Sequence, residues 1–537
     1  MALEFLTQKL KAYTGKEVAV IPSAQTSCED SFVFHRFARD VLKTRNIVSP
    51  SGVSPLEAAG RIGQKTGVWF PLNFRFEEVE CARVILVVGA DPAESHPILW
   101  LHILKAVRGG ADLVFVGPAA PIGLRHVSLW LQTHPGTEDI VCDFLAKRLI
   151  EKGHGKKKED MAGFSSYRRA VGRMALSQVV SSTGVSPGVV DQAVERLSKG
   201  GVFIVAGAGL TQFPSGERNL VSLWNLGLLV NSRVFLLGLE SNSRGMFEIQ
   251  KGLALRVKSM EKIREAIRSG QVKAIYAAGP LPLGKKDKVE FLIIQDSYMS
   301  EAAERADVVL PAATFAESAG TFVNAEGRIQ SFPAVVPPRG EAKPDWWILT
   351  RLAERRGRKD FRYPRVADIR RDIKTLLPGF RKLSLSGRRR RQPVFIQEES
   401  KPQERFLPLQ PREPGVKTSR SYPFLLWAEY GLDSYRNLVL AHEVKGLRII
   451  RNPRWFRIHP EDAQKAGIED GQTVEVLSRL GKTRGIGKVS TAVPRGVITA
   501  HLLWGEASEF SLVPHVSSPA QASSSISLIP VNIKRGE

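Results

Sequence analysis

Cysteine is scarce in this sequence of 537 residues, which contains only three. Cys28, Cys81 and Cys142 are each separated from the next by more than 50 positions, and no C-x-x-C pair occurs. Structural zinc sites and four-cysteine iron–sulfur sites draw their thiolates from closely spaced pairs. The sequence therefore predicts neither kind of site.

Long apolar runs are also missing, because no window approaches the roughly 20 apolar residues of a membrane-spanning helix. The amino terminus, MALEFLTQKLKAYTGKEVAVI, is typical of a helix followed by a strand. It has neither the apolar segment of a signal peptide nor a twin-arginine motif. We expect a soluble, cytoplasmic protein without a membrane span. Attachment to the cytoplasmic face of a membrane through partner subunits stays open.

Acidic residues are outnumbered, since 54 Asp and Glu face 77 Lys and Arg, for a net charge of +23. This excess fits nucleic acid, acidic lipid, a phosphate-bearing cofactor or a solvated basic surface. The run Arg388–Arg391 could bind acidic lipid, nucleic acid or a partner subunit. A solvated basic linker is the favoured interpretation, and nucleic acid is not expected as a partner. With 43% hydrophobic and 24% charged residues, the chain has globular composition and length for three or four domains.

Residues 291–349 carry the most informative pattern. The apolar run FLIIQ predicts a buried parallel strand that leads to Asp296, Ser300 is placed to cap a short helix, and ADVVLP predicts a second strand stopped by Pro311. GTFVNAEGRIQ, interrupted by glycine and asparagine, predicts an exposed hairpin or loop. Because open parallel sheets bind ligands beyond the carboxyl ends of their strands, this segment predicts a ligand-binding crevice.

Residues 82–118 alternate strand, polar loop, helix and strand, as in a nucleotide-binding fold. The loop after the first strand lies next to a helix start, where backbone donors suit a phosphate or pyrophosphate. The predicted cofactor-binding residues of this loop are Gly89, Asp91, Pro92, Glu94 and His96. A helix-capping or core histidine is an equally good interpretation of His96.

Three patterns follow one another from 296 to 349: D-x-x-x-S-E-x-A-x-x-A-D-V-V-L-P, E-x-x-G-T-F-V-N-x-E-G-R-x-Q and P-x-G-E-A-x-P-D-W-x-I-L. HPEDAQKAGIEDGQTVEVLSRLG, nearer the carboxyl terminus, is similar to molybdopterin dinucleotide-binding domains, with His459 in place of their asparagine. With these patterns the chain resembles the molybdopterin oxidoreductase superfamily, from about Ile21 to Glu506. That superfamily includes formate dehydrogenases, nitrate reductases and the large peripheral subunit of the proton-pumping NADH:quinone oxidoreductase.

The resemblance implies molybdopterin guanine dinucleotide as the cofactor. HPGTE resembles R-P-G-T-D, a loop that contacts the guanine arm, and its glutamate retains the chemistry of a carboxylate that accepts two hydrogen bonds from guanine. A turn alone would also explain this motif. The residues that the resemblance assigns to cofactor binding are Pro135, Gly136, Glu138, Gly207, Gly209, Thr211, Gln212, Asn242, Asp296, Ser300, Glu301, Thr321 and Asn324.

Two positions depart from the catalytic relatives. Their pattern C-H-x-P-S-V-x-x-L, which begins with the metal ligand, falls on VSPSGVSPL and places Val48 at the ligand and Ser49 at the histidine. Valine cannot bind a metal. Ser49, Ser51 or Ser54 could supply an oxygen ligand, although a plain loop is the simpler interpretation. The asparagine of G-x-N-P is missing from AAGPLPLG, and the cysteine-rich front domain is missing as well. We therefore expect no catalytic or metal-ligating residue and no iron–sulfur cluster on this chain, and molybdenum is doubtful.

The expected fold class is α/β, with two interleaved doubly wound domains followed by a six-stranded β-barrel of the double-psi type. The first domain comprises residues 1–45 and 246–356, and the second, inserted domain comprises residues 46–245. Residues 357–420, rich in proline, arginine and serine, predict a basic linker. Short β runs over residues 421–537 predict the barrel, which resembles a molybdopterin dinucleotide-binding domain.

Three functions follow from this resemblance. The favoured one is a subunit of an electron-transfer complex resembling the large peripheral subunit of NADH:quinone oxidoreductase, with the molybdenum ligand lost and no independent catalysis. Its expected partners are iron–sulfur and NADH- or quinone-reductase subunits. The alternative is the molybdopterin guanine dinucleotide-binding chain of a split formate dehydrogenase-like oxidoreductase, and the third is a scaffold without redox chemistry.

Overall fold

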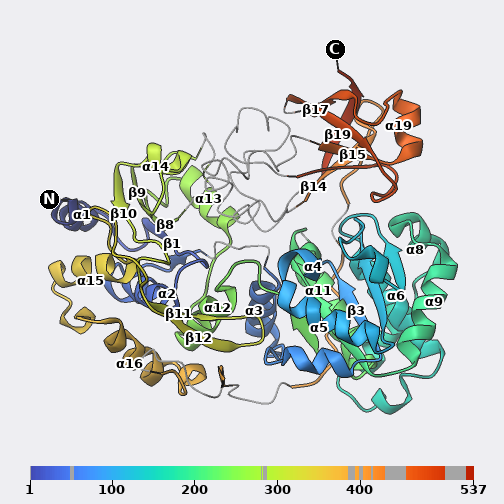
Figure 1. Cartoon of the computed structure of the whole chain (residues 1–537), viewed down its shortest axis with the longest axis horizontal. Coiled ribbons are helices and arrows are strands. Elements are labelled where there is room, and N and C mark those ends of the chain that lie inside the picture. The colour runs from blue at the N-terminus through green and yellow to red at the C-terminus, as the bar shows by residue number, and fades with distance from the viewer. Residues whose placement is uncertain are drawn as a thin grey trace. The chain divides into compact units, whose positions relative to one another are not determined.

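The computed structural model describes residues 2–48, 54–213, 215–279, 281, 283, 287–384, 393–397, 403–412, 415–429, 455–479, 481–501 and 528–536. These residues form two compact units (Figure 1). Unit 1 contains the described residues up to 48 and from 238 to 397, and unit 2 contains those from 54 to 237 and from 403 onward. The first part of unit 2, residues 54–237, therefore lies between the two parts of unit 1 in the sequence, and its second part follows them.

Unit 1 is built on a five-stranded parallel sheet of order β10-β9-β8-β1-β2. Its strands are β1 (Val18–Ile21), β2 (Asn46–Ile47), β8 (Ala274–Ala278), β9 (Phe291–Asp296) and β10 (Val308–Pro311). Val18 and Val20 pack into one apolar cluster, and Ala19 and Ile21 pack into another. Successive side chains of a strand point to opposite faces, so both faces of this sheet are buried.

The helices of unit 1 are α1 (Ala2–Lys9), α2 (Cys28–Arg36), α12 (Ser243–Gly252), α13 (Met260–Arg268), α14 (Glu301–Glu304), α15 (Asp345–Arg355) and α16 (Val366–Leu376). A π-helical turn, Phe37–Val41, continues α2. Ser300 caps α14 by accepting the Ala303 N–H, which confirms the predicted cap. The predicted hairpin is also confirmed, because β11 (Gly320–Val323) pairs antiparallel with β12 (Arg328–Phe332), and β13 (Val394–Phe395) adds a third strand. The expected exposure is wrong for β11, because Thr321 is buried and Val323 packs into the larger apolar cluster.

The first part of the expected linker is folded into unit 1. Helix α16 buries Ile369 and Ile373 in the larger apolar cluster, together with Phe361 and Phe380. The linker prediction is therefore wrong for these residues. Their apolar side chains, spaced at helical intervals, form one buried face although proline and arginine dominate the composition around them.

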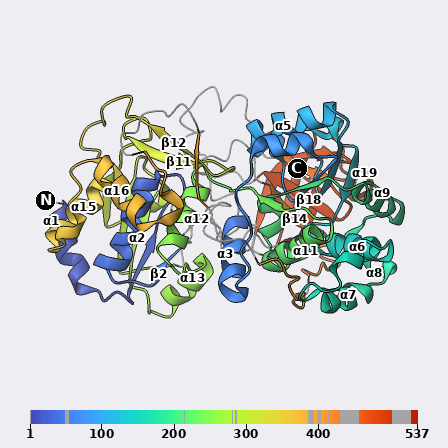
Figure 2. The same cartoon turned by 90° about the horizontal axis from the view of Figure 1, so that it is seen from below.

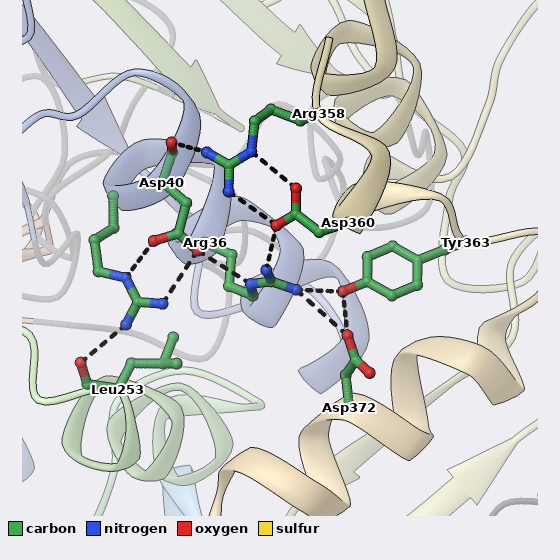
Figure 3. A network of polar contacts seen from close by, with 8 residues as sticks. Arg36, Asp40, Leu253, Arg358, Asp360, Tyr363 and Asp372 are labelled. Atoms are coloured by element: carbon green, nitrogen blue, oxygen red, sulfur yellow. Dashed lines mark hydrogen bonds and ion pairs between the residues drawn. The ribbon is translucent and has the colours of Figure 1, made fainter. Parts of the chain in front are cut away.

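Arg36, the last residue of α2, contacts residues 360–372 of the expected linker (Figure 3). Its buried guanidinium lies 4.6 Å from the centroid of the Phe361 ring. The oxygen atoms that accept hydrogen bonds from it, with their distances, are Asp40 Oδ2 (3.2 Å), Asp360 Oδ2 (2.9 Å), Tyr363 Oη (2.5 Å) and Asp372 Oδ2 (3.3 Å). Because three carboxylates surround one buried cation, residues 360–372 are anchored rather than free.

Unit 2 contains a second parallel sheet, of order β5-β4-β3-β6-β7. Its strands are β3 (Val84–Val88), β4 (Asp112–Gly117), β5 (Leu129–Gln132), β6 (Val202–Ala206) and β7 (Val234–Leu236). The chain runs outward from β3 to β5 on one side and from β6 to β7 on the other. The strand order thus reverses between β3 and β6, and ligands of open α/β sheets bind at such a switch point.

The helices around this sheet are α3 (Pro55–Thr66), α4 (Pro92–Ser95), α5 (Pro97–Arg108), α6 (Glu138–Glu151), α7 (Phe164–Gly172), α8 (Leu176–Thr183), α9 (Pro187–Ser198), α10 (Ala208–Thr211) and α11 (Gly216–Leu229). Helix α6 contacts α7, α8, α9 and α11, and Figure 2 shows α7, α8 and α9 gathered beside it. In the described part of the chain, no helix is both long and apolar enough to cross a membrane.

The carboxy-terminal strands of unit 2 close into a six-stranded barrel of order β14-β18-β15-β17-β16-β19, which confirms the expected barrel. Its strands are β14 (Phe424–Glu429), β15 (Trp455–Ile458), β16 (Thr473–Leu477), β17 (Lys482–Val489), β18 (Val497–His501) and β19 (Ile529–Arg535), and α19 (Pro460–Ala466) follows β15. The barrel meets the α/β part of unit 2 where Ala120 N donates to Ala492 O at 3.0 Å.

Candidate cofactor-binding site

Two glycine-containing loops meet at the switch point of unit 2. The loop after β3 begins at Gly89, and after β6 Gly207 precedes the short helix α10, which contains Gly209. The Gly209 N–H donates to Gly89 O at 2.8 Å. A Cβ on Gly207 would lie 2.5 Å from the Ala90 Cβ, and one on Gly209 would lie 2.7 Å from Gly89 O. These predicted site glycines are therefore brought together, and they permit the two backbones to touch.

The polar side chains in the loop after β3 make hydrogen bonds that stabilise the loop itself. Asp91 caps α4 by accepting the Ala93 N–H at 3.1 Å, and its other oxygen accepts the Ile122 N–H at 2.7 Å. Pro92 is the first residue of α4, followed by Glu94. His96 separates α4 from α5, and burial lowers its pKa to about 4, so its ring is neutral at pH 7.

The HPGTE turn, which follows β5, lies against the loop after β6. Gly136 adopts φ +74°, and a Cβ there would lie 3.0 Å from the Phe213 ring. Phe213 comes directly after Thr211 and Gln212, which are both buried. The structure thus places the turn that carries Pro135, Gly136 and Glu138 beside the segment that ends with Thr211 and Gln212.

Glu138 is the first residue of α6 and has an exposed fraction of 1%. Its Oε2 atom has no hydrogen-bond partner among the described residues. Burial raises the pKa of this carboxyl group to about 8, and the Asp139 charge adds to the rise. The backbone N–H groups of Gly136 and Glu138 and the Arg412 guanidinium act in the opposite direction. A buried carboxyl group with an unused oxygen is the clearest candidate for a ligand contact in unit 2.

Three charged residues near Glu138 were not predicted from the motifs. Asp139 is fully buried and accepts from Arg218 Nε at 2.8 Å, and Arg412 donates to Gly136 O. Two buried acids on α6, Asp139 and Asp143, signal that cations must lie nearby. The spacing of residues in the chain does not indicate which arginines those are.

The predicted residues of unit 1 are held mainly by protein contacts. The Asn242 side chain donates to Thr26 O at 2.8 Å and accepts the Val323 N–H at 3.0 Å. Thr321 donates both its N–H and its hydroxyl to Glu29 Oε2, at 2.7 and 3.1 Å. Their assignment to cofactor binding stays a prediction.

The remaining predicted residues of unit 1 lie at turns. Asp296 ends β9 and accepts the Ser297 N–H at 2.7 Å, and Ser300 caps α14. Asn324 accepts the Arg328 N–H at 2.8 Å, which closes the turn of the β11–β12 hairpin. The side chain of Glu301 lies outside the described residues. The sheet edge beyond β9 thus carries the polar side chains that the sequence predicted there.

Val48, which stands at the expected position of the metal ligand, is fully buried in an apolar cluster of unit 1. Its N–H donates to Val20 O at 2.9 Å. In unit 2, Ser54 precedes α3, and its buried Oγ atom has no hydrogen-bond partner among the described residues. Ser49, Ser51 and part of AAGPLPLG lie outside the described residues. Within the described ranges, no group of three or more His, Cys, Asp or Glu side chains could hold a metal ion.

A family model for molybdopterin oxidoreductases matches residues 1–355, and one for the molybdopterin dinucleotide binding domain matches residues 434–527. The chain belongs to the molybdopterin oxidoreductase family. This membership accounts for the two doubly wound sheets and the carboxy-terminal barrel. Of the second match, residues 455–479 and 481–501 are described.

Known members of the family are similar to this chain over most of its length. It is 27% identical to the F420-dependent formate dehydrogenase subunit alpha of Methanocaldococcus jannaschii, over 93% of this chain and 83% of that protein. It is 24% identical to formate dehydrogenase H of Escherichia coli, over 94% and 80% respectively. The solved structure of acetylene hydratase from Pelobacter acetylenicus matches with a TM-score of 0.77 and 16% identity, covering 100% of this chain and 89% of that one. This last likeness shows the fold alone.

The barrel motif of this family member builds a turn and a helix start. His459, which replaces the asparagine of the family pattern, caps α19 by accepting the Glu461 N–H at Nδ1. Asp462 accepts the Gly496 N–H at 2.6 Å and so links α19 to the residue that precedes β18. Both motif residues therefore have structural partners inside the barrel.

Proposed function

We propose that this chain binds a molybdopterin guanine dinucleotide and serves as the pterin-binding subunit of a formate dehydrogenase-like oxidoreductase. Membership of the family and the similarity to two formate dehydrogenase chains support the class of cofactor and reaction. The observation that carries the proposal is the buried, unpartnered Oε2 atom of Glu138.

The chemistry of Glu138 fits a guanine base. The Watson–Crick edge of guanine presents two parallel N–H donors, at N1 and N2, and an ionised carboxylate accepts two such bonds side by side. Leaving a buried carboxylate oxygen unpaired is unfavourable, and a guanine edge would satisfy it. The glycine loops at the β3–β6 switch point present backbone next to this turn, as dinucleotide sites in open sheets do.

When bound, the molybdopterin group supplies two-electron redox chemistry with its metal. The residues of this chain bind and orient its nucleotide arm. We propose that iron–sulfur and NADH- or quinone-reductase subunits act as partners that carry the electrons away.

One observation favours a second candidate, a chain resembling the large peripheral subunit of NADH:quinone oxidoreductase in which the metal ligand is lost. Val48 has no donor atom and is buried in an apolar cluster. In that case the chain would have an architectural role in an electron-transfer complex.

The GMP and molybdenum contents of the purified chain distinguish these two candidates. Cells grown with molybdate provide the protein, acid hydrolysis releases GMP from any bound dinucleotide, and elemental analysis measures molybdenum. GMP with molybdenum supports the formate dehydrogenase-like subunit, and GMP without molybdenum supports the subunit that has lost its ligand. Protein with neither GMP nor molybdenum would contradict the formate dehydrogenase-like subunit and would agree only with an architectural role.

A substitution links the result to the site. Glu138→Ala should lower the GMP content at least several-fold, because it removes the acceptor of the guanine edge. Glu151→Ala, on the exposed end of the same helix, provides the matched control and should leave the GMP content unchanged.

A further inference from the structure

Residues 403–412, which we call the strap, lie within the expected linker but are docked on the α/β part of unit 2. Phe406 is buried, with ring centroids 5.1 Å from Phe164 and 5.4 Å from Tyr167. Leu407 exchanges two hydrogen bonds of 2.9 Å with the side chain of Asn225. The linker prediction is wrong here as well, because side chains of α7 and α11 supply the strap with a buried apolar and polar surface.

The end of the strap reaches the HPGTE turn. The Arg412 guanidinium donates to Gly136 O, and its Nε atom lies 3.9 Å from Asp139 Oδ2. Two residues earlier, Gln410 O accepts from Arg218 Nη1 at 2.7 Å. The strap therefore contacts both the turn and the arginine that faces the buried acids of α6.

Arg218 and Arg412 act on different acidic groups of this cluster. Arg218 pairs with Asp139 at 2.8 Å and with Asp143 at 3.1 Å. Arg412 is the cation that lowers the pKa of Glu138, against the effects of burial and of Asp139. The other titratable groups near this cluster are His134 in the turn, Cys142 on α6 and Tyr167 on α7, which donates to Asp143 Oδ1 at 3.4 Å.

We propose that Arg412 is a positioning residue for the guanine pocket, holding the turn that carries Glu138 and facing its carboxyl group with a positive charge. This inference rests on the proposed function, because it assumes that Glu138 accepts hydrogen bonds from a guanine base. It adds a residue of the expected linker to that site and makes guanine binding depend on the docked strap.

The proposed role has a signature in the pH dependence of binding. The N1 and N2 groups of guanine both donate, so a protonated Glu138, with an O–H group on one of its two oxygens, cannot accept both hydrogen bonds, and the paired contact requires the carboxylate. Affinity for guanine should therefore rise with pH as the group ionises near pH 8. Removal of the Arg412 charge raises the pKa of Glu138 further, so the rise should occur at higher pH.

The test is calorimetric titration of GMP into the full chain, prepared from cells that cannot make the pterin, between pH 6 and 9. Arg412→Gln should bind about 10-fold more weakly at pH 7, with its pH profile displaced upward by about one unit. Arg412→Lys keeps the charge and should keep the profile of the wild type. Arg405→Gln is the matched control, since Arg405 lies on the same strap but donates to Thr66 O.

Each outcome decides the proposal. An Arg412→Gln profile equal to that of the wild type overturns it, and so does an equal loss for Arg412→Gln and Arg405→Gln at every pH, which would show only loosening of the strap. If Glu138→Gln abolishes binding while Arg412→Gln does not change it, the proposed function stands and the role of Arg412 falls. If the wild-type chain binds no GMP at any pH, both fall.

Discussion

Asn242 and Gly245 show how a motif residue can serve the fold of this protein. The buried side chain of Asn242 connects the loop after β1 to β11, through Thr26 O and the Val323 N–H. Gly245, one turn along α12, leaves room for it, because a Cβ there would lie 2.2 Å from Asn242 Oδ1 and 2.7 Å from Cys28 Sγ. The spacing of Asn242 and Gly245, with two residues between them, is thus explained by packing in unit 1.

Gly245→Ala should destabilise the protein although alanine favours helix. The gain in helix propensity is at most about 1 kcal/mol, whereas overpacking costs about 1–3 kcal/mol and also threatens the buried hydrogen bonds of Asn242. Denaturant unfolding measures the net change. Gly188→Ala on α9, where a Cβ meets nothing within 4 Å, should be neutral or stabilising. A stabilising Gly245→Ala would refute this account of the motif.

At the scale of elements, the structure differs most from the sequence prediction at α16 and at the strap. Both lie in the span whose composition predicts a linker, and both bury apolar side chains: Ile369 and Ile373 of α16 in unit 1, and Phe406 and Leu407 of the strap in unit 2. A segment rich in proline and arginine packs well when a few apolar residues have a prepared surface to cover.

Phe406→Ala should lower the free energy of unfolding by about 3 kcal/mol, because it leaves a cavity between the rings of Phe164 and Tyr167. Urea unfolding followed by tryptophan fluorescence provides the measurement. Val416→Ala, at a position with an exposed fraction of 41%, should change the free energy by no more than about 0.5 kcal/mol. Similar values for the two variants would mean that the strap is not docked in solution.

At the scale of the whole molecule, two units with separate cores share one chain. The sheet of unit 1 is buried between its own two apolar clusters, and the barrel of unit 2 has a cluster of its own. Units with their own cores can unfold as separate cooperative blocks.

Differential scanning calorimetry should accordingly resolve two transitions, each sensitive to substitutions in one unit. Arg36→Met, which leaves Asp40, Asp360 and Asp372 without their buried cation, should lower only one of them, with a loss of about 2–3 kcal/mol. Phe406→Ala should lower only the other. A single transition that both variants shift alike would contradict the independence of the units.

The sequence by itself determined the fold class, the family and most of the elements. Runs such as FLIIQD and VILVV are buried on both faces of parallel sheets, and Ser300 caps its helix, because these features depend on residues that are adjacent in the chain. The sequence also placed Gly89 in the loop after a strand, and the resemblance assigned Glu138, Gly207 and Gly209 to the cofactor. Their meeting at the switch point followed from the strand order.

Only the tertiary structure decided which residues surround that site. Arg412 contacts a turn 276 residues away in the sequence, and Asn225 binds the strap across 182 residues. Composition around the strap predicted a linker, because a local pattern does not reveal a distant surface that a segment can cover. The sequence alone therefore revealed neither the arginine near Glu138 nor the hydrogen-bond partners of Asn242. Contacts between residues that are distant in the chain depend on how whole elements are arranged in space.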